Sequence, residues 1–123
     1  MLSASVENLS PVTAADIPRF STPEERFLAE ILIRNPHLIF YYEPHIFGKR
    51  PDFYVYNLTA QSGKIVEVTR CRRSELPSDL SKQEQIDALN LSGEPFTILC
   101  RENIEKMRRR YGYPKSYFQR SKT

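Results

Sequence analysis

Apolar and polar positions alternate along the chain with two different periods, and each period indicates a different kind of element. The first helical stripe is formed by four apolar residues, Phe27, Leu28, Ile31 and Leu32. A Ser-Thr pair before Pro23 is a typical helix start, and Glu24 or Glu25 would complete a capping box. Asn35 and Pro36 end the pattern. The sequence therefore predicts a helix between these two signals.

Three segments that follow have the β-branched and aromatic composition of strands. They cover residues 37–44, the stretch from 51, and the stretch from 64. Residues 58–63 between the last two form a short polar loop that ends in glycine, so we expect a hairpin. A fourth strand is expected at 95–100.

Two further helices complete the expected order αβββαβα. The first runs from 79 to about 91, and the second covers 101–111, with apolar residues on one face. Residues 1–20 are polar and lack periodicity, which predicts a flexible arm. The expected organisation is therefore this arm, one α/β domain over 21–111, and a basic and aromatic tail over 112–123.

The composition is that of an ordinary globular chain. It has 123 residues, 40% of them apolar and 27% charged, which favours one domain with one core. No run of about 18 apolar residues predicts a membrane span, and no secretory signal is recognisable. Cys71 and Cys100 lack metal-ligand spacing and are expected to be free thiols inside the cell, in the cytoplasm or nucleoid.

Two carboxylates occupy strand positions where apolar residues are usual. A hairpin turn near Ala60 places Asp52 opposite Glu67 or Val68, and facing residues lie within about 5.5 Å of each other. Since Val66 and Val68 need burial, Glu67 among them needs a partner, and a divalent cation such as Mg²⁺ would supply one. The alternative for each acid alone is a turn residue or a solvent-facing strand position.

The stretches around Pro51-Asp52 and Glu67-Val68-Thr69, preceded by a helix with a Ser-x-x-Glu start, resemble the PD-(D/E)XK nuclease superfamily. This resemblance spans residues 21–108 and implies a restriction-endonuclease-like αβββαβ core, with a central mixed sheet flanked by helices. It also implies a Mg²⁺-dependent DNA endonuclease in which Mn²⁺ can substitute. A weaker similarity to transposon endonuclease subunits and phage-type junction resolvases suggests roles in transposition or DNA recombination.

The resemblance also implies a role for each site residue. Asp52 and Glu67 would hold the metal, and Glu24 would complete its shell, or else simply cap the helix. The family's lysine position is occupied by Thr69, which cannot carry positive charge. Lys82, on the helical stripe that follows the third strand, is the best replacement, with a solvent-edge position as the alternative.

Positive charge is concentrated after the third strand and near the C-terminus. The expected nucleic-acid contacts are Arg70, Arg72, Arg73, Arg108, Arg109 and Arg110. Tyrosines beside the second group would suit base stacking, unless the tail docks on the domain. Three hypotheses follow: an endonuclease acting on DNA, an inactive nuclease-fold module, or a protein-interaction subunit. A homodimer or a larger assembly is compatible with each of them.

Overall fold

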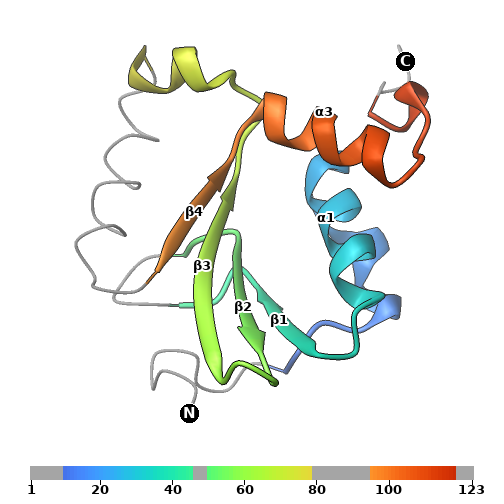
Figure 1. The fold of residues 1–123 in the computed structure, drawn as a ribbon, viewed down its shortest axis with the longest axis vertical. Helices are drawn as coiled ribbons and strands as arrows, with labels where there is room; N and C mark the ends of the chain where they lie inside the picture. The colour runs from blue at the N-terminus through green and yellow to red at the C-terminus, as the bar shows by residue number, and fades with distance from the viewer. Residues whose placement is uncertain (1–9, 46–49, 79–94, 119–123) are drawn as a thin grey trace.

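Four strands form one mixed sheet in the order β1-β2-β3-β4 (Figure 1). The structure is a computed structural model that describes residues 10–45, 50–78 and 95–118. Antiparallel pairing joins the first three strands, and β4 runs parallel to β3. The strands are β1 (Leu38–Tyr42), β2 (Phe53–Asn57), β3 (Ser62–Val68) and β4 (Phe96–Leu99). The expected α/β class and the hairpin are confirmed.

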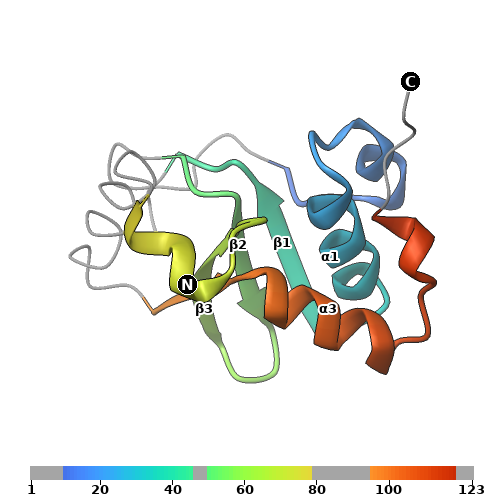
Figure 2. The same cartoon turned by 90° about the horizontal axis from the view of Figure 1, so that it is seen from above.

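The two long helices of the described chain, α1 and α3, lie on the same face of this sheet (Figure 2). None of the helices described has the length and apolar character that a bilayer crossing requires. The helix expected at 79–91 lies outside the described residues. The helical elements are η2 (Ala14–Arg19), α1 (Pro23–Ile33), η3 (Arg73–Ser78), α3 (Arg101–Arg110) and η4 (Lys115–Tyr117).

Reciprocal hydrogen bonds fix the start of α1. The Thr22 hydroxyl accepts from the Glu25 N–H at 3.1 Å, and the Glu25 carboxylate accepts from the Thr22 N–H at 3.3 Å. Pro23 occupies the first helical position, where its missing N–H costs nothing. Thr22, and not Ser21, is therefore the N-cap of α1. Its capping-box partner is Glu25, which is buried.

Alternation along the strands divides the core into two layers. Phe53, Val66 and Val68 face α1 and α3 and pack with Phe27 and Ile104 in the main core. The alternate positions form a second apolar layer on the opposite face, which contains Tyr41, Tyr54, Tyr56 and Ile65. Because β3 is buried on both faces, its one acidic residue, Glu67, is enclosed as well.

The second half of the expected N-terminal arm belongs to the fold, so the prediction of a flexible arm over 1–20 is wrong for these residues. The Val12 N–H donates to the Phe40 carbonyl at 2.8 Å beside β1. Ile17 and Phe20 are buried in the main core, and Phe20 stacks on Tyr42 with ring centroids 3.9 Å apart. One buried residue on a short 3₁₀ helix and a second at its C-cap do not form a periodic pattern that the sequence would reveal.

The aromatic residues of the C-terminal tail dock on α1. Tyr113, Tyr117 and Phe118 surround Phe27 with edge-on rings, at centroid distances of 4.9 to 5.9 Å. The hydroxyls of both tyrosines donate to the carboxylate of Glu30, at 2.8 and 2.9 Å. These rings therefore hold the tail on the domain, in agreement with the docked-tail alternative.

The bond between Tyr117 and Glu30 predicts a pH-dependent contribution to stability. Burial and the neighbouring Glu30 carboxylate raise the pKa of Tyr117 above its ordinary value of 10.0. The contribution is therefore fully present below about pH 10 and is lost as the pH rises above that value, because the unfolded phenol ionises first. Tyr117→Phe should cost about 1 kcal/mol at neutral pH and reduce this alkaline loss.

Urea unfolding of both proteins between neutral and alkaline pH measures the effect. The exposed Tyr111 offers a matched control, and Tyr111→Phe should leave the pH profile unchanged. Equal stability of wild type and Tyr117→Phe at neutral pH would contradict the assigned role of this bond.

Candidate functional site

Asp52 and Glu67 face each other where β2 and β3 lie side by side. Phe53 pairs with Val66, so the residue before Phe53 is opposite the residue after Val66. The Asp52 N–H donates to Glu67 Oε2 at 3.1 Å, and the Val68 N–H donates to Asp52 Oδ2 at 2.7 Å. Each acid thus binds the backbone of the other's strand, and the predicted pairing of the two acids is confirmed.

Glu67 is completely enclosed, with 0% of its surface exposed. A buried carboxylate is costly unless hydrogen bonds or a cation compensate its charge. No buried polar side-chain atom among the described residues lacks a hydrogen-bond partner, so Glu67 is compensated by its surroundings. Asp52 is only partly buried and forms the solvent side of the pair.

The acid of α1 that reaches Asp52 is Glu25, and not Glu24 as the sequence resemblance implies. Glu25 is 6% exposed and contacts Asp52, whose charge acts on the Glu25 carboxyl. Glu24, the residue that was selected, instead accepts a 3.1 Å hydrogen bond from Arg70. The capping box with Thr22 was the available signal for Glu25, because it fixes the rotation of the helix start.

Burial raises the pKa of Glu25 above its ordinary value of 4.5, and the Asp52 charge raises it further. Hydrogen bonds from Tyr42 and Thr22 oppose this shift by favouring the ionised form. Two carboxyl groups in contact cannot both ionise without a penalty, so they tend to share a proton. A proton on the Glu25–Asp52 pair therefore relieves the repulsion between these two carboxylates.

Tyr42 fixes the orientation of Glu25. Its hydroxyl donates to Glu25 Oε1 at 2.8 Å and accepts from the Ser21 N–H at 3.2 Å. The ring of Tyr42 is held in turn by its stack on Phe20. Tyr42 was not a candidate from the sequence, because a tyrosine at the end of a strand is an ordinary core residue.

The donor set suits Mg²⁺ by its chemistry. All of the acidic donors here are carboxylate oxygens, and Mg²⁺ is commonly bound by one or two carboxylates together with waters and substrate phosphates. No group of three or more His, Cys, Asp and Glu side chains within the described residues is arranged to hold a metal ion. The carboxylates that could take part in holding such an ion are those of Asp52 and Glu67, with Glu25 beside Asp52.

Thr69 follows directly after β3 and has a structural role of its own. Its hydroxyl accepts from the Cys71 N–H at 3.1 Å, and its N–H donates to the Leu99 carbonyl at 3.0 Å. The side chain thereby stabilises the turn that leads the chain away from the sheet. Lys82, the expected replacement for the missing lysine, lies outside the described residues.

The basic residues after β3 differ in their surroundings. Arg70 is mostly exposed and binds Glu24, which places one cation beside the acids. The Arg72 N–H donates to Glu75, and its side chain is exposed. Arg73 donates to the Ile98 carbonyl and to Asn103, each at 3.1 Å, so it links the end of β4 to the start of α3.

The three consecutive arginines at the end of α3 also differ in their surroundings. Arg108 is 7% exposed and donates to Glu105 at 2.6 Å and to the Tyr113 carbonyl at 2.7 Å. It therefore anchors the tail and is not placed for a phosphate contact, contrary to the expectation for this residue. Arg109 and Arg110 are exposed and stay candidates for such contacts.

No family model, curated protein or solved structure matches this chain, so its function is argued from the chain's own residues.

The raised pKa of Glu25 predicts that stability falls as the pH increases. The folded chain binds a proton at Glu25 more readily than the unfolded chain, so this contribution is complete below about pH 4.5 and is lost as the pH rises through the raised value. Glu25→Gln stays neutral and can still accept from Tyr42. The urea midpoint of Glu25→Gln should therefore vary less with pH over this range. At higher pH it should exceed the wild-type midpoint.

Glu24→Gln provides the control, because it removes an acid that lies one residue away and pairs with the mostly exposed Arg70. It should leave the wild-type pH dependence intact. Identical pH profiles for wild type and Glu25→Gln would show that Glu25 does not retain a proton in the folded chain.

Proposed function

We propose that this chain is a Mg²⁺-dependent DNA endonuclease with a restriction-endonuclease-like core. The observation that carries the proposal is the apposition of Asp52 and Glu67, each bonded to the backbone of the other's strand. The four-strand mixed sheet supports the proposal, and the described elements follow the order of the αβββαβ core that the sequence resemblance implies, except for its second helix, which would lie outside the described residues. Transposon ends, branched junctions and ordinary duplexes are the candidate substrates.

Each acid would have a separate task. Asp52 and Glu67 would hold the ion, because they lie opposite each other on neighbouring strands and backbone hydrogen bonds orient their carboxylates. Glu25 would hold a proton next to Asp52, and Tyr42 keeps its Oε1 in position. When bound, Mg²⁺ would stabilise charge that develops on the phosphate and lower the pKa of water.

Hydrolysis joins a water oxygen to phosphorus, breaks one P–O bond, and transfers a proton from the water to the leaving side. A positioned acid–base group typically accelerates such a step by about 10²–10⁴-fold. With Thr69 in the lysine position, we expect a slow enzyme unless Lys82 or another group compensates. Arg70 can contribute positive charge toward a phosphate, but it cannot act as a base.

A binding or assembly module on the same fold is the second candidate function. One observation favours it: the Thr69 hydroxyl, in the position of the family's lysine, is used in a turn. Such a module would bind nucleic acid through exposed arginines without cleaving it. The two candidates differ in one measurable property, which is metal-dependent cleavage.

The endonuclease proposal predicts slow nicking of supercoiled plasmid in Mg²⁺ or Mn²⁺ that EDTA abolishes. Asp52→Asn and Glu67→Gln should each abolish nicking, because the amides lose the charge yet can still accept the backbone hydrogen bonds. Glu105→Gln, an acid on α3 away from the site, is the matched control and should retain activity. Lys82→Ala should also abolish cleavage if Lys82 compensates for the missing lysine.

Variants at position 69 measure how much the missing positive charge lowers the rate of cleavage. Thr69→Ala and Thr69→Lys both lose the hydrogen bond from Cys71, and they differ in positive charge. Faster cleavage by Thr69→Lys than by Thr69→Ala is expected where nothing compensates. No cleavage by wild type of any DNA form, together with equal inactivity of both variants, would favour the binding module.

Arg109 and Arg110 are exposed on α3, so we expect part of the affinity for DNA to depend on the salt concentration. Replacing Arg109 and Arg110 with Ala should reduce the slope of log K against log salt by about 0.9 per lost phosphate contact on duplex DNA. The control double variant, Arg19→Ala with Lys64→Ala, removes the same charge elsewhere and should leave the slope unchanged. A salt titration by fluorescence anisotropy measures both, and an unchanged slope for the first variant would remove these arginines from the interface.

A further inference from the structure

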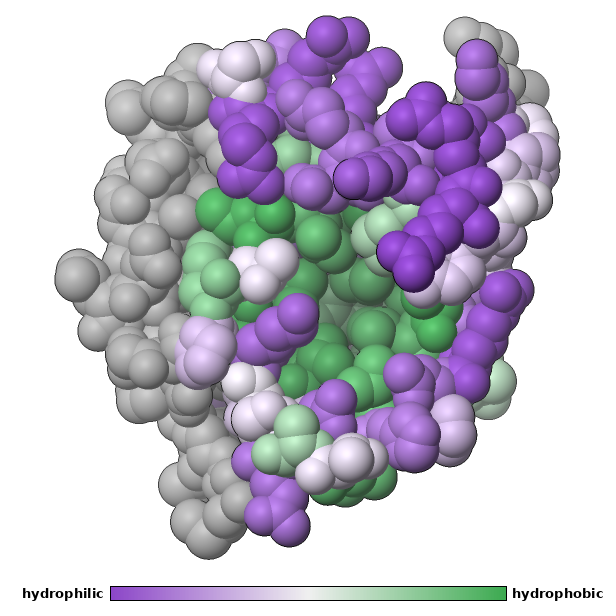
Figure 3. Space-filling view, in the orientation of Figure 1, coloured by the Kyte–Doolittle hydropathy of each residue, from purple (hydrophilic) through white to green (hydrophobic). Residues whose placement is uncertain are grey.

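A large apolar hollow lies between the two helices and the sheet, toward the sheet end opposite the acids. It measures about 930 Å³, and Figure 3 shows its apolar surface open to solvent in the described part of the chain. Its floor includes Leu28 and Leu32 of α1, Val55 and Val66 of the sheet, and Leu99 and Met107. We call this surface the α1–β4 groove. None of the six belongs to the proposed cleavage site.

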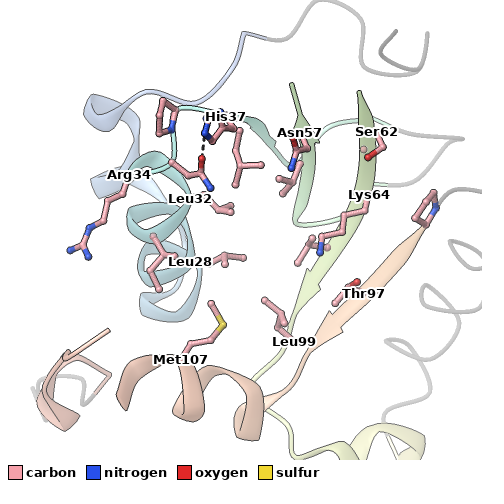
Figure 4. A pocket seen from close by; sticks show the side chains of 18 of the residues that line it. Leu28, Leu32, Arg34, His37, Asn57, Ser62, Lys64, Thr97, Leu99 and Met107 are labelled. Atoms are coloured by element: carbon pink, nitrogen blue, oxygen red, sulfur yellow. Dashed lines mark hydrogen bonds between the residues drawn. The ribbon is translucent and has the colours of Figure 1, made fainter. Parts of the chain in front are cut away.

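The charge around the α1–β4 groove has one sign. The cations Arg34 and Lys64 line it, and no acidic side chain does so among the described residues. Figure 4 shows Lys64 reaching from β3 over the hollow toward α1, whereas Arg34 points away. Arg34 donates to the Tyr113 hydroxyl at 2.9 Å and lies over its ring, so Lys64 is the cation available to an occupant.

The shape of the groove fits a helix. Helices normally cover the apolar face of a sheet, and here α1 and α3 leave part of that face uncovered in the described part of the chain (Figure 3). An amphipathic helix inserts its apolar side chains into such a hollow at positions i, i+3 or i+4, and i+7. An acidic residue at the edge of the inserted face would meet Lys64.

Other occupants fit less well. Bases stack on aromatic rings, and Tyr111 is the one Phe, Tyr or Trp among the described lining residues, so nucleic acid gains little here. A second copy of this chain carries the same net charge of +3. Its described helices also use their acids internally, since Glu24, Glu30 and Glu105 bind Arg70, two tyrosines and Arg108.

We propose that the α1–β4 groove is the docking site for an acidic amphipathic helix of a partner protein. Aliphatic side chains of that helix cover Leu28, Leu32, Leu99 and Met107, and a carboxylate of the helix pairs with Lys64. The proposal is independent of nuclease activity, because the groove shares no residue with the acidic pair. It would make the chain a subunit that is attached to an assembly through one end of its sheet.

The test uses the full chain and two synthetic peptides of about 18 residues, a length that gives a stable amphipathic helix. One peptide carries a leucine stripe flanked by glutamates, and the other has lysine in place of each glutamate. Methyl NMR signals of Leu28, Leu32, Leu99 and Met107 report occupation of the groove. The acidic peptide should shift these signals, and the lysine peptide should not.

Three variants make the test specific to the groove. Lys64→Glu should weaken acidic-peptide binding roughly fivefold or more, because attraction becomes repulsion. Thr97→Trp fills the sheet side of the groove from a half-buried strand position and should abolish binding. Lys115→Glu makes the same charge change on an exposed residue outside the groove, and it should bind like wild type.

Several results would overturn the proposal. They are equal binding of both peptides, or no methyl shift at about 1 mM acidic peptide. Methyl signals that depend on protein concentration would indicate a second copy in the groove. Groove methyls shielded from a soluble paramagnetic agent in the free protein would show that the chain itself fills the space, and methyl shifts caused by duplex DNA would assign this face to a nucleic acid.

Discussion

The arrangement of the candidate site depends on the exchange of hydrogen bonds between two carboxylates and the backbone of the facing strand. Asp52 binds the Val68 N–H, and Glu67 binds the Asp52 N–H. These bonds take the place of ladder bonds just beyond the last regular pair of β2 and β3, where Phe53 is opposite Val66. They therefore orient both carboxyl groups and compensate part of the cost of burying them through backbone dipoles.

Elements around this exchange complete the local structure. The Thr69 hydroxyl turns the chain immediately after β3, and Arg70 then reaches Glu24 at the start of α1. The neighbouring Glu25 contacts Asp52 and is held by Tyr42. The start of α1 is thus connected to the neighbouring strands through two successive acids. Glu24 pairs with Arg70, which follows β3, and Glu25 contacts Asp52, which precedes β2.

Local patterns predicted most of the fold. Alternation in β3 predicted the burial of Val66 and Val68, and the turn expected near Ala60 placed Asp52 opposite Glu67 or Val68, of which the observed register selects Glu67. Glu24 and Glu25 were harder to distinguish, because each is three or four residues from apolar positions of the same stripe. The N-cap distinguishes them: Thr22, and not Ser21, caps the helix, and the capping box is completed by Glu25, which Tyr42 also binds. Arg108 was misjudged for a similar reason: its burial comes from the Tyr113 carbonyl, which the tail brings back to the helix.

The parallel pairing of β3 with β4 has a consequence for the order of folding. Parallel neighbours require a long crossover, and here the chain passes from Val68 to Phe96 before the fourth strand pairs. All of the acids at the candidate site come from residues 24–67, where the hairpins form through contacts that are close in sequence. Loop-closure entropy delays the distant pairing, so the acids should assemble in a partly folded chain before β4 and α3 join it.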